Sequence, residues 1–374
     1  MEFRRAIGLA LGIIFVATPA WAQLATFEIL HAEDHVGASL SADGTVVGIS
    51  GASASGYAFA HDLETDTRLF GVEGLNGTTA PSISGDGSAA HGRVFGEVDE
   101  YFFYENGTLS FVPGTTTYAA GGISHDGSVI TLTDSNRAAL RTGGFTGPLQ
   151  YLDASPGTGI DSVASDVSAD GRIVAGSIDT ATGTSELFRW SPGGGLERLG
   201  QFGGSERETR AAAISADGST IVGNAMTAGS FHEGLPFLWR DGAFTALGAL
   251  PGDENGLAFD VSGDGARVVG SSGLGRFFGG GTAFVWDEHD GLQDMSVLLQ
   301  SLGIDLTDIE LHMASAISAD GRTIVGTGYE RYEYAREIVW KAVLPPVPEP
   351  TTGLLLGLGL LGLAGGRPSR ERER

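Results

Sequence analysis

The sequence predicts an all-β fold built from seven similar units, and three observations lead to this prediction. Glycine makes up 60 of the 374 residues and is dispersed among short apolar runs, which is typical of a chain with many turns and short strands. A Ser-x-Asp-Gly phrase followed by an apolar run recurs seven times. An aromatic-rich segment with a polar turn follows these phrases, as in PFLWRDGAFTALG at residues 236–248. Such recurrence predicts a repeat architecture.

The Ser-x-Asp-Gly phrase predicts the first hairpin of each unit. Consecutive aspartates are 40 to 47 residues apart, and the last step is 56 residues. Aspartate and serine accept hydrogen bonds from nearby backbone N–H groups and glycine takes a positive φ, so the phrase suits a structural turn. The predicted turn aspartates are Asp43, Asp86, Asp126, Asp170, Asp217, Asp264 and Asp320.

The aromatic-rich segment predicts a second hairpin. Phe237 and Trp239 alternate with Leu238 and Arg240, and Asp241-Gly242 then turns the chain. Two hairpins give four strands per unit, and four-stranded units of this period are typical of the blades of a β-propeller. A β-solenoid is the alternative architecture. We expect the recurring Trp190, Trp239, Trp286 and Trp340 to share one register of the third strand and to pack between blades.

The two ends of the repeat region predict how the ring closes. The seventh unit stops after its third strand, at Val343, and the segment ATFEIL at 25–30 resembles the missing fourth strand. We therefore expect residues 25–30 to pair with 337–343, which leaves no open sheet edge.

The long last step between aspartates contains an insertion. Met295, Leu298, Leu299 and Leu302 follow helical spacing, and Asp294 or Ser296 can cap a short helix there. We expect this helix to pack on the outside of the last blades.

The N-terminus has the three parts of a secretory signal peptide. Two arginines precede the apolar run AIGLALGIIFVATPA, and Ala-Trp-Ala follows at 20–22. This order predicts a signal peptide over 1–22, recognised through Ala20 and Ala22 and cleaved after Ala22. A buried N-terminal helix is the alternative.

The C-terminus resembles the PEP-CTERM sorting signal of Gram-negative bacteria. Pro348, Glu349 and Pro350 precede the apolar run 353–366 and an arginine-rich tail, in which Glu371 and Glu373 depart from the usual pattern. The resemblance implies an exported precursor that enters the inner membrane transiently through 353–366 and is processed by an exosortase. A permanent anchor is the alternative, although 14 residues are short for a span of roughly 20.

The predicted organisation is therefore a signal peptide at 1–22, a propeller at 23–344, a Pro-rich linker at 345–350 and a sorting segment at 351–374. Within 36–340 the units also resemble those of HAF-repeat extracellular proteins, as in LFRWSPGGGLERLGQFGG followed by AAAISADGSTIVG. That family implies an extracellular setting and supplies no catalytic residues.

Candidate chemistry in the sequence is sparse. One aspartate per unit cannot complete the roughly six to eight oxygen ligands of calcium, so we expect no cofactor and keep Ca²⁺ as an open alternative. His31 and His35 are four apart but lie outside a helical metal motif. Loop carboxylates that a glycan-cleaving enzyme would need in pairs occur at Asp99-Glu100, Glu206 with Glu208, and Asp253-Glu254.

Composition limits the partners. The formal net charge of −24 and the lack of a basic, aromatic-interleaved run exclude a nucleic-acid partner, and the chain has no cysteine for disulfides or thiolate metal sites. We predict a non-enzymatic binding or structural protein of the cell surface or extracellular matrix, with export machinery, exosortase and exopolysaccharide as partners. A propeller enzyme acting on extracellular polysaccharide or another polymer is the alternative.

Overall fold

A computed structural model describes the propeller and a few flanking residues. The described residues are 25–31, 35–51, 57–73, 77–95, 100–113, 119–152, 160–204, 207–227, 234–273, 281–331 and 335–346. By its contacts the chain divides into the unit Ala25–Leu344 and a second unit made of Met1–Leu24 and Pro345–Arg374.

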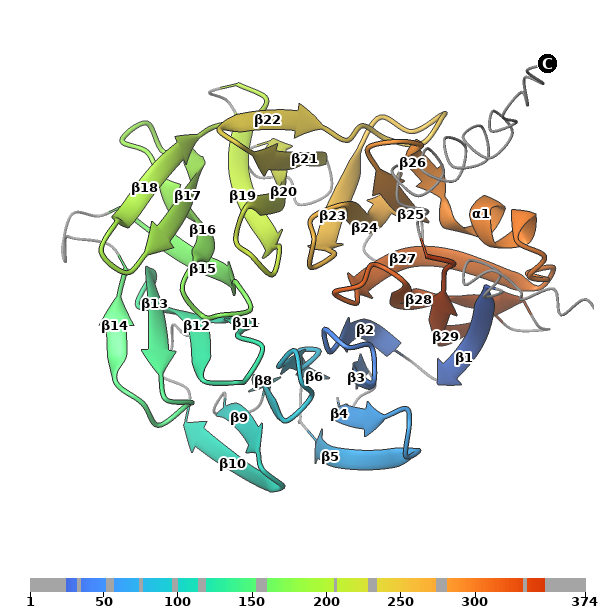
Figure 1. Ribbon diagram of the computed structural model, residues 1–374, viewed down its shortest axis with the longest axis horizontal. Helices are drawn as coiled ribbons and strands as arrows, with labels where there is room; N and C mark the ends of the chain where they lie inside the picture. Colours follow the sequence, from blue (N-terminus) through green and yellow to red (C-terminus); the bar gives the residue numbers. More distant parts are fainter. Residues whose placement is uncertain are drawn as a thin grey trace, which may run out of the picture. The chain divides into compact units, whose positions relative to one another are not determined.

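The unit Ala25–Leu344 is a seven-bladed β-propeller, as the repeats predict (Figure 1). Each blade is an antiparallel sheet whose first strand lies innermost and whose last strand lies at the rim. From the centre outward, the first blade contains β2 (His35–Leu40), β3 (Val46–Gly51), β4 (Tyr57–Asp62) and β5 (Thr67–Glu73). The second blade contains β6 (Gly77–Thr78) and β7 (Ser82–Ile83), then β8 (Ala89–Phe95), β9 (Glu100–Glu105) and β10 (Thr108–Pro113). The third blade contains β11 (Ala119–Ile123), β12 (Val129–Asp134), β13 (Arg137–Thr142) and β14 (Leu149–Tyr151).

The next three blades continue the same order around the ring. The fourth blade contains β15 (Ser162–Val167), β16 (Val174–Asp179), β17 (Ser185–Ser191) and β18 (Gly195–Gly200). The fifth blade contains β19 (Arg207–Ile214), β20 (Thr220–Thr227), β21 (Gly234–Arg240) and β22 (Ala243–Ala246). The sixth blade contains β23 (Gly256–Val261), β24 (Arg267–Ser272), β25 (Thr282–Asp287) and β26 (Gly291–Asp294).

The seventh blade closes the ring with a strand from the other end of the domain. It contains β27 (Ile309–Ile317), β28 (Thr323–Arg331) and β29 (Ala335–Val343), and β1 (Thr26–His31) is its outermost strand. β1 pairs antiparallel with β29 from Thr26 opposite Val343 to His31 opposite Val339. The Phe27 ring stacks on Trp340, with centroids 6.3 Å apart. The predicted closure is confirmed.

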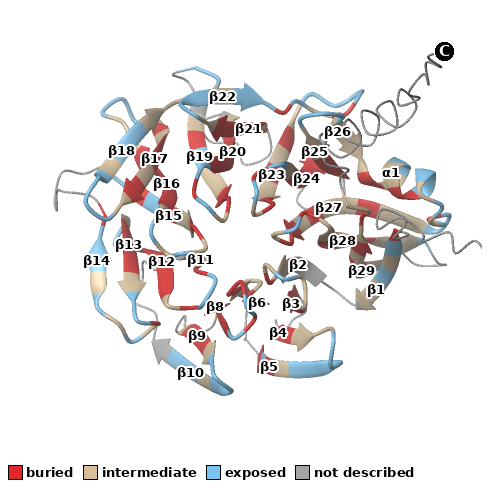
Figure 2. Ribbon diagram, in the orientation of Figure 1, coloured by how far each residue is buried: buried red, intermediate tan, exposed pale blue. Residues whose placement is uncertain are grey.

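Glycine and a large side chain form the centre of most blades. Gly176, Gly223 and Gly270 on the second strands pair across the sheet with phenylalanines on the third strands. A Cβ on Gly223 would lie 2.7 Å from the Phe237 ring and 2.1 Å from the Arg210 carbonyl oxygen, so only glycine leaves room for the ring. These aromatic rings are fully buried, whereas much of the rim strands is exposed (Figure 2).

One register prediction is wrong. Trp190, Trp239 and Trp286 lie two residues beyond the phenylalanine that faces the glycine. In the seventh blade Trp340 itself faces the equivalent Gly326. The ladder pairing sets the register, and an aromatic residue in either position fills the space, so residue type alone did not reveal the shift.

The inserted segment forms α1 (Met295–Ser301), the one helix among the described residues. Asp294 caps it by accepting from the N–H groups of Ser296 and Val297. Met295 and Leu299 are buried in the cluster shared by the last two blades, and Val297 faces solvent, so α1 packs outside those blades as expected.

Candidate functional site at the central channel

The seven Ser-x-Asp-Gly phrases form equivalent turns at one end of the innermost strands, at residues 41–44, 84–87, 124–127, 168–171, 215–218, 262–265 and 318–321. In each turn the serine hydroxyl donates to the aspartate Oδ1 at 2.6 to 2.9 Å. The same oxygen accepts the N–H two residues further on, at 2.9 to 3.0 Å. The glycines have φ between 69° and 77°. The contacts of each carboxylate are thus those of a turn.

These contacts favour the ionised form of several turn aspartates. The Ser219 N–H holds the pKa of Asp217 below its usual value, and the Ser168 hydroxyl does the same for the pKa of Asp170. The serine hydroxyl also accepts the N–H five residues on, such as Thr220 N to Ser215 Oγ at 3.0 Å. Side chains of one turn therefore satisfy several backbone donors that a hairpin end leaves unpaired.

Backbone hydrogen bonds join the seven turns to one another. Ala169 N–H donates to the Ala216 carbonyl at 3.0 Å, and Ala216 N–H donates to the Gly263 carbonyl at 3.0 Å. Each remaining turn also donates to the next, through the aspartate N–H in the turns of Asp43 and Asp86, and Ala319 N–H closes the circle on the Ala42 carbonyl at 2.7 Å. The turns form a continuous ring around the mouth of the channel.

The channel behind this ring is a cavity of about 370 Å³, lined by the innermost strands of all seven blades. The position four residues before each turn aspartate faces it. This position differs among blades: it is Ser39, Ser82, Gly122, Asp166, Ala213, Asp260 and Ala316.

Two carboxylates occupy the channel position, and each bridges to the next blade. Asp166 accepts from its neighbour Val167 N–H at 2.8 Å and from Ile214 N–H of the next blade at 3.0 Å. Asp260 accepts from Val261 N–H at 2.8 Å and from Ile317 N–H at 2.8 Å. Both follow a register shift in their strands, and such a bulge re-aims a side chain.

Burial raises the pKa of Asp166 to about 6. Burial, together with the nearby Asp166, raises the pKa of Asp260 to about 7. The channel therefore holds a pair of acids that titrate near neutral pH, an environment typical of functional sites. Sequence reasoning missed both residues. An alignment of the seven repeats would have shown them as the two acids at an otherwise small or hydroxyl position.

The predicted loop carboxylates serve separate local contacts. Glu208 pairs with Arg210 (2.5 Å between Oε2 and Nη2), and Asp253 accepts the Ser272 hydroxyl at 2.8 Å. Glu254 is exposed and Glu100 begins β9. Asp99 and Glu206 lie outside the described residues, as do the side chains of His31 and His35.

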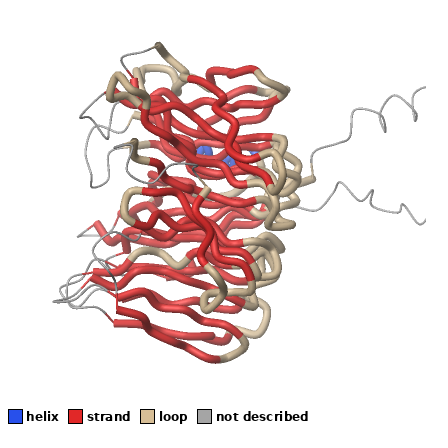
Figure 3. The backbone as a smooth tube through the Cα atoms, turned by 90° about the vertical axis from the view of Figure 1, so that its left-hand side faces the viewer, coloured by secondary structure: helices blue, strands red, loops and turns tan. Residues whose placement is uncertain are grey.

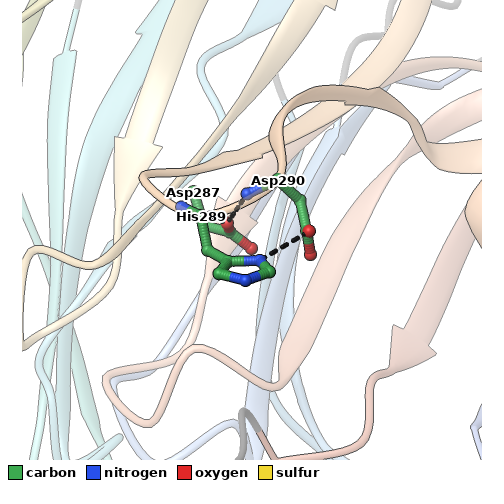
Figure 4. Close-up of side chains that lie close together, drawn as sticks. All are labelled: Asp287, His289 and Asp290. Atoms are coloured by element: carbon green, nitrogen blue, oxygen red, sulfur yellow. Dashed lines mark hydrogen bonds and ion pairs between the residues drawn. The ribbon is translucent and has the colours of Figure 1, made fainter. Parts of the chain in front are cut away.

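The group of three potential metal ligands among the described residues is at a different place. Asp287, His289 and Asp290 lie in the turn between β25 and β26, with ligand atoms within 4.8 Å of one another (Figure 4). Asp287 Oδ1 accepts the N–H groups of His289 and Asp290, and His289 Nδ1 lies 2.6 Å from Asp290 Oδ1. His289 and Asp290 are exposed, so the cluster fits a polar surface turn.

The sorting calls fall outside the described residues. These are Ala20, Ala22, Pro348, Glu349, Pro350 and the run 353–366. Within the described part of the chain, none of the helical structure is long and apolar enough to cross a bilayer.

Comparison with known proteins identifies the C-terminal signal and the fold. A model of the PEP-CTERM protein-sorting motif matches residues 346–370, which indicates an exported protein processed at its C-terminus. No curated protein matches the sequence significantly.

Solved propellers are similar at low identity. The β-propeller domain of the Trilobed protease from Pyrococcus furiosus is 12% identical with a TM-score of 0.53, covering 84% of this chain and 94% of that one. Kuenenia stuttgartiensis hydrazine synthase is 15% identical with a TM-score of 0.53, covering 80% and 94%. TolB from Acinetobacter baumannii is 17% identical with a TM-score of 0.47, covering 66% of this chain and 62% of TolB. At these identities the likeness to the first two structures shows the fold alone.

Proposed function

We propose that the chain is an exported, exosortase-processed propeller that acts at the cell surface or in the extracellular matrix as a non-enzymatic binding or structural protein. The sorting motif at 346–370 is the observation that carries the proposal. The signal-peptide pattern at 1–22 supports it, because a chain that is sorted through its C-terminus must first be exported. The mature protein would span about residues 23–350, with the export machinery and exosortase as transient partners.

The contacts in the channel favour a structural role for its two acids over a catalytic one. Both oxygens of Asp166 and of Asp260 accept backbone N–H groups, so these acids stabilise neighbouring strands. The turn aspartates are also held by structural contacts, since Oδ1 of each accepts a serine hydroxyl and a backbone N–H. We extend the proposal to kinship with HAF-repeat proteins, on the two phrases that recur in each unit, and to exopolysaccharide as the bound polymer.

Processing is tested with the full-length chain expressed in a host that carries an exosortase. Wild-type protein is expected at the cell surface or in the medium without residues 351–374, as read from its C-terminal peptide by mass spectrometry. Glu349→Ala is expected to accumulate uncleaved in the membrane fraction. Surface protein that still carries 351–374 would contradict the proposal.

An enzyme acting on extracellular polysaccharide is the second candidate, favoured by the two channel acids with raised pKa. A degradation screen on polysaccharides from the producing cells separates the two functions. Activity that Asp166→Asn or Asp260→Asn abolishes, with the fold intact, would replace the binding function by an enzymatic one.

A further inference from the structure

A second cavity lies on the propeller face opposite the Ser-x-Asp-Gly turns. Its volume is about 330 Å³, and it is lined by residues of β12, β15, β16, β17 and β19, which belong to blades three to five. Ser162 pairs with Ile178 at the end of β15 and β16 that is remote from their turn at Asp170, which places the cavity on the other face. Figure 3 shows loops on both faces of the blades.

Charged and amide groups surround the cavity. Asp161, Asp179, Arg210 and Asn136 all line it. Asn136 Nδ2 donates to Asp161 Oδ2 at 3.2 Å, and Arg210 pairs with Glu208 beside the cavity. Burial raises the pKa of Asp179, and the nearby Asp161 and Glu208 raise it further. Additional hydrogen-bond donors from a ligand would therefore stabilise the ionised form of this carboxylate.

Two hydroxyl groups of the lining make no hydrogen bond within the described part of the fold. Thr133 and Ser185 are each 6% exposed, and neither Thr133 Oγ1 nor Ser185 Oγ has a hydrogen-bond partner among the described residues. Their neighbours differ: Ser162 Oγ accepts from Ala138 N–H at 2.9 Å, and Ser177 Oγ accepts from Ala211 N–H at 3.0 Å. Buried polar groups are normally paired, so unpaired ones that line a cavity indicate a polar ligand.

An apolar contact completes the lining. Val163 is 42% exposed and lines the same cavity. A sugar ring has an apolar C–H face together with hydroxyls that both donate and accept. Hydroxyls, carboxylates, an amide and one valine match that combination, and the volume lies at the lower end of small-molecule sites.

We propose that this cavity binds one neutral sugar unit of a polysaccharide, with its hydroxyls on Thr133, Ser185 and Asp179. The proposal rests on the proposed function and assigns that function a site. Asp161 and Asp179 would repel the charge of a uronic acid, and Arg210 would offset part of their attraction for an ammonium sugar, so the proposal commits to an uncharged unit.

The test is isothermal titration of the full-length protein with three neutral tetrasaccharides, built from glucose, mannose and galactose. Tetragalacturonate and a chitosan tetramer serve as acidic and cationic probes, and each titration is repeated with EDTA. At least one neutral probe is expected to bind more tightly than both charged probes, with the same Kd in EDTA.

The variant Thr133→Val with Ser185→Ala is expected to weaken that binding by about tenfold, because two hydrogen bonds to the sugar are lost. Removing unpaired hydroxyls carries little risk to folding, which the Tm will show. Ser315→Ala is the matched control, because Ser315 Oγ is also buried without a partner among the described residues but lines the channel instead. It is expected to bind like wild type.

Several outcomes would overturn the site. These are no binding of any neutral probe up to about 10 mM, tighter binding of a charged probe, loss of binding in EDTA, or an unchanged Kd in the double variant. A double variant that still retains polysaccharide from the producing cells would refute this site and leave the proposed function standing.

Discussion

The two faces of the propeller are built on different rules. On one face the same four-residue turn occurs seven times, with the same internal contacts and a closed circle of hydrogen bonds. On the other face the turns have no common sequence: Asp134–Arg137 reverses the chain directly, whereas Asp179 and Ser185 flank a longer, threonine-rich turn. Repetition thus marks what holds the blades together, and the variable face carries the ligand cavity that we propose.

The largest expected effect tests the circular closure on which both faces depend. Deleting residues 25–30 removes β1, its ladder with β29 and the Phe27 ring on Trp340. We expect loss of the cooperative transition or a Tm lower by about 10 °C or more, measured by calorimetry. Deletion of 351–374 is the control and should leave the Tm unchanged. A shift of only a few degrees after the first deletion would show that the ring does not need β1.

The channel acids give the second effect, which has a definite sign. The pKa values of Asp166 and Asp260 are raised from 3.8 to about 6 and about 7, so the folded state binds more protons than the unfolded state in this range. Their contribution to stability is therefore greatest at about pH 4 and below, and it decreases as the pH rises to about 7, by roughly 3 to 4 kcal/mol for each group.

Urea unfolding from pH 4 to pH 8 measures this dependence. The double variant Asp166→Asn with Asp260→Asn is expected to show a smaller fall in free energy of unfolding with rising pH. The change with pH is the readout, because each amide NH₂ would face a backbone N–H and lower stability at every pH. Identical pH dependence in wild type and variant would mean that the two carboxyls titrate normally in the folded protein.

The smallest effects compare one turn on each face directly. Asp217→Ala removes the acceptor for Ser215 Oγ and Ser219 N–H and is expected to cost about 1–2 kcal/mol. Thr182→Ala lies in the exposed turn of the opposite face, where Thr182 contacts the Thr180 hydroxyl, and should change stability by less than about 0.5 kcal/mol. Equal costs in denaturant unfolding would remove the distinction between the faces.

The repeated part of the fold was accessible from the sequence because each unit carries its own local signals. Ser215, Asp217 and Gly218 specify a turn through contacts within a few residues, and such contacts need no knowledge of the rest of the chain. The missing fourth strand of the last unit likewise pointed to residues 25–30. The register of Trp340 was predicted wrongly because ladder pairing, rather than residue type, sets which side chain faces Gly326.

The candidate sites were harder to predict from the sequence, since the environment of their residues is formed by neighbours in other blades. Asp166 accepts a backbone N–H 48 positions further along the chain. Neither this contact nor the burial of Asp166 can be predicted from the residues beside it in the sequence. Thr133 and Ser185 look like ordinary strand residues. Only the packing of blades three to five leaves them buried beside an unfilled polar cavity.

By itself the sequence determined the number of blades, their turns and the closing strand, because these depend on local hydrogen bonding and on period, and it also showed the C-terminal sorting motif. The tertiary structure decided which side chains face the channel, which carboxyls lie near each other there and which hydroxyls remain unpaired. These properties depend on the distance between residues of different blades. The sequence of one repeat does not specify that distance, because it is set only when the blades pack into a closed ring.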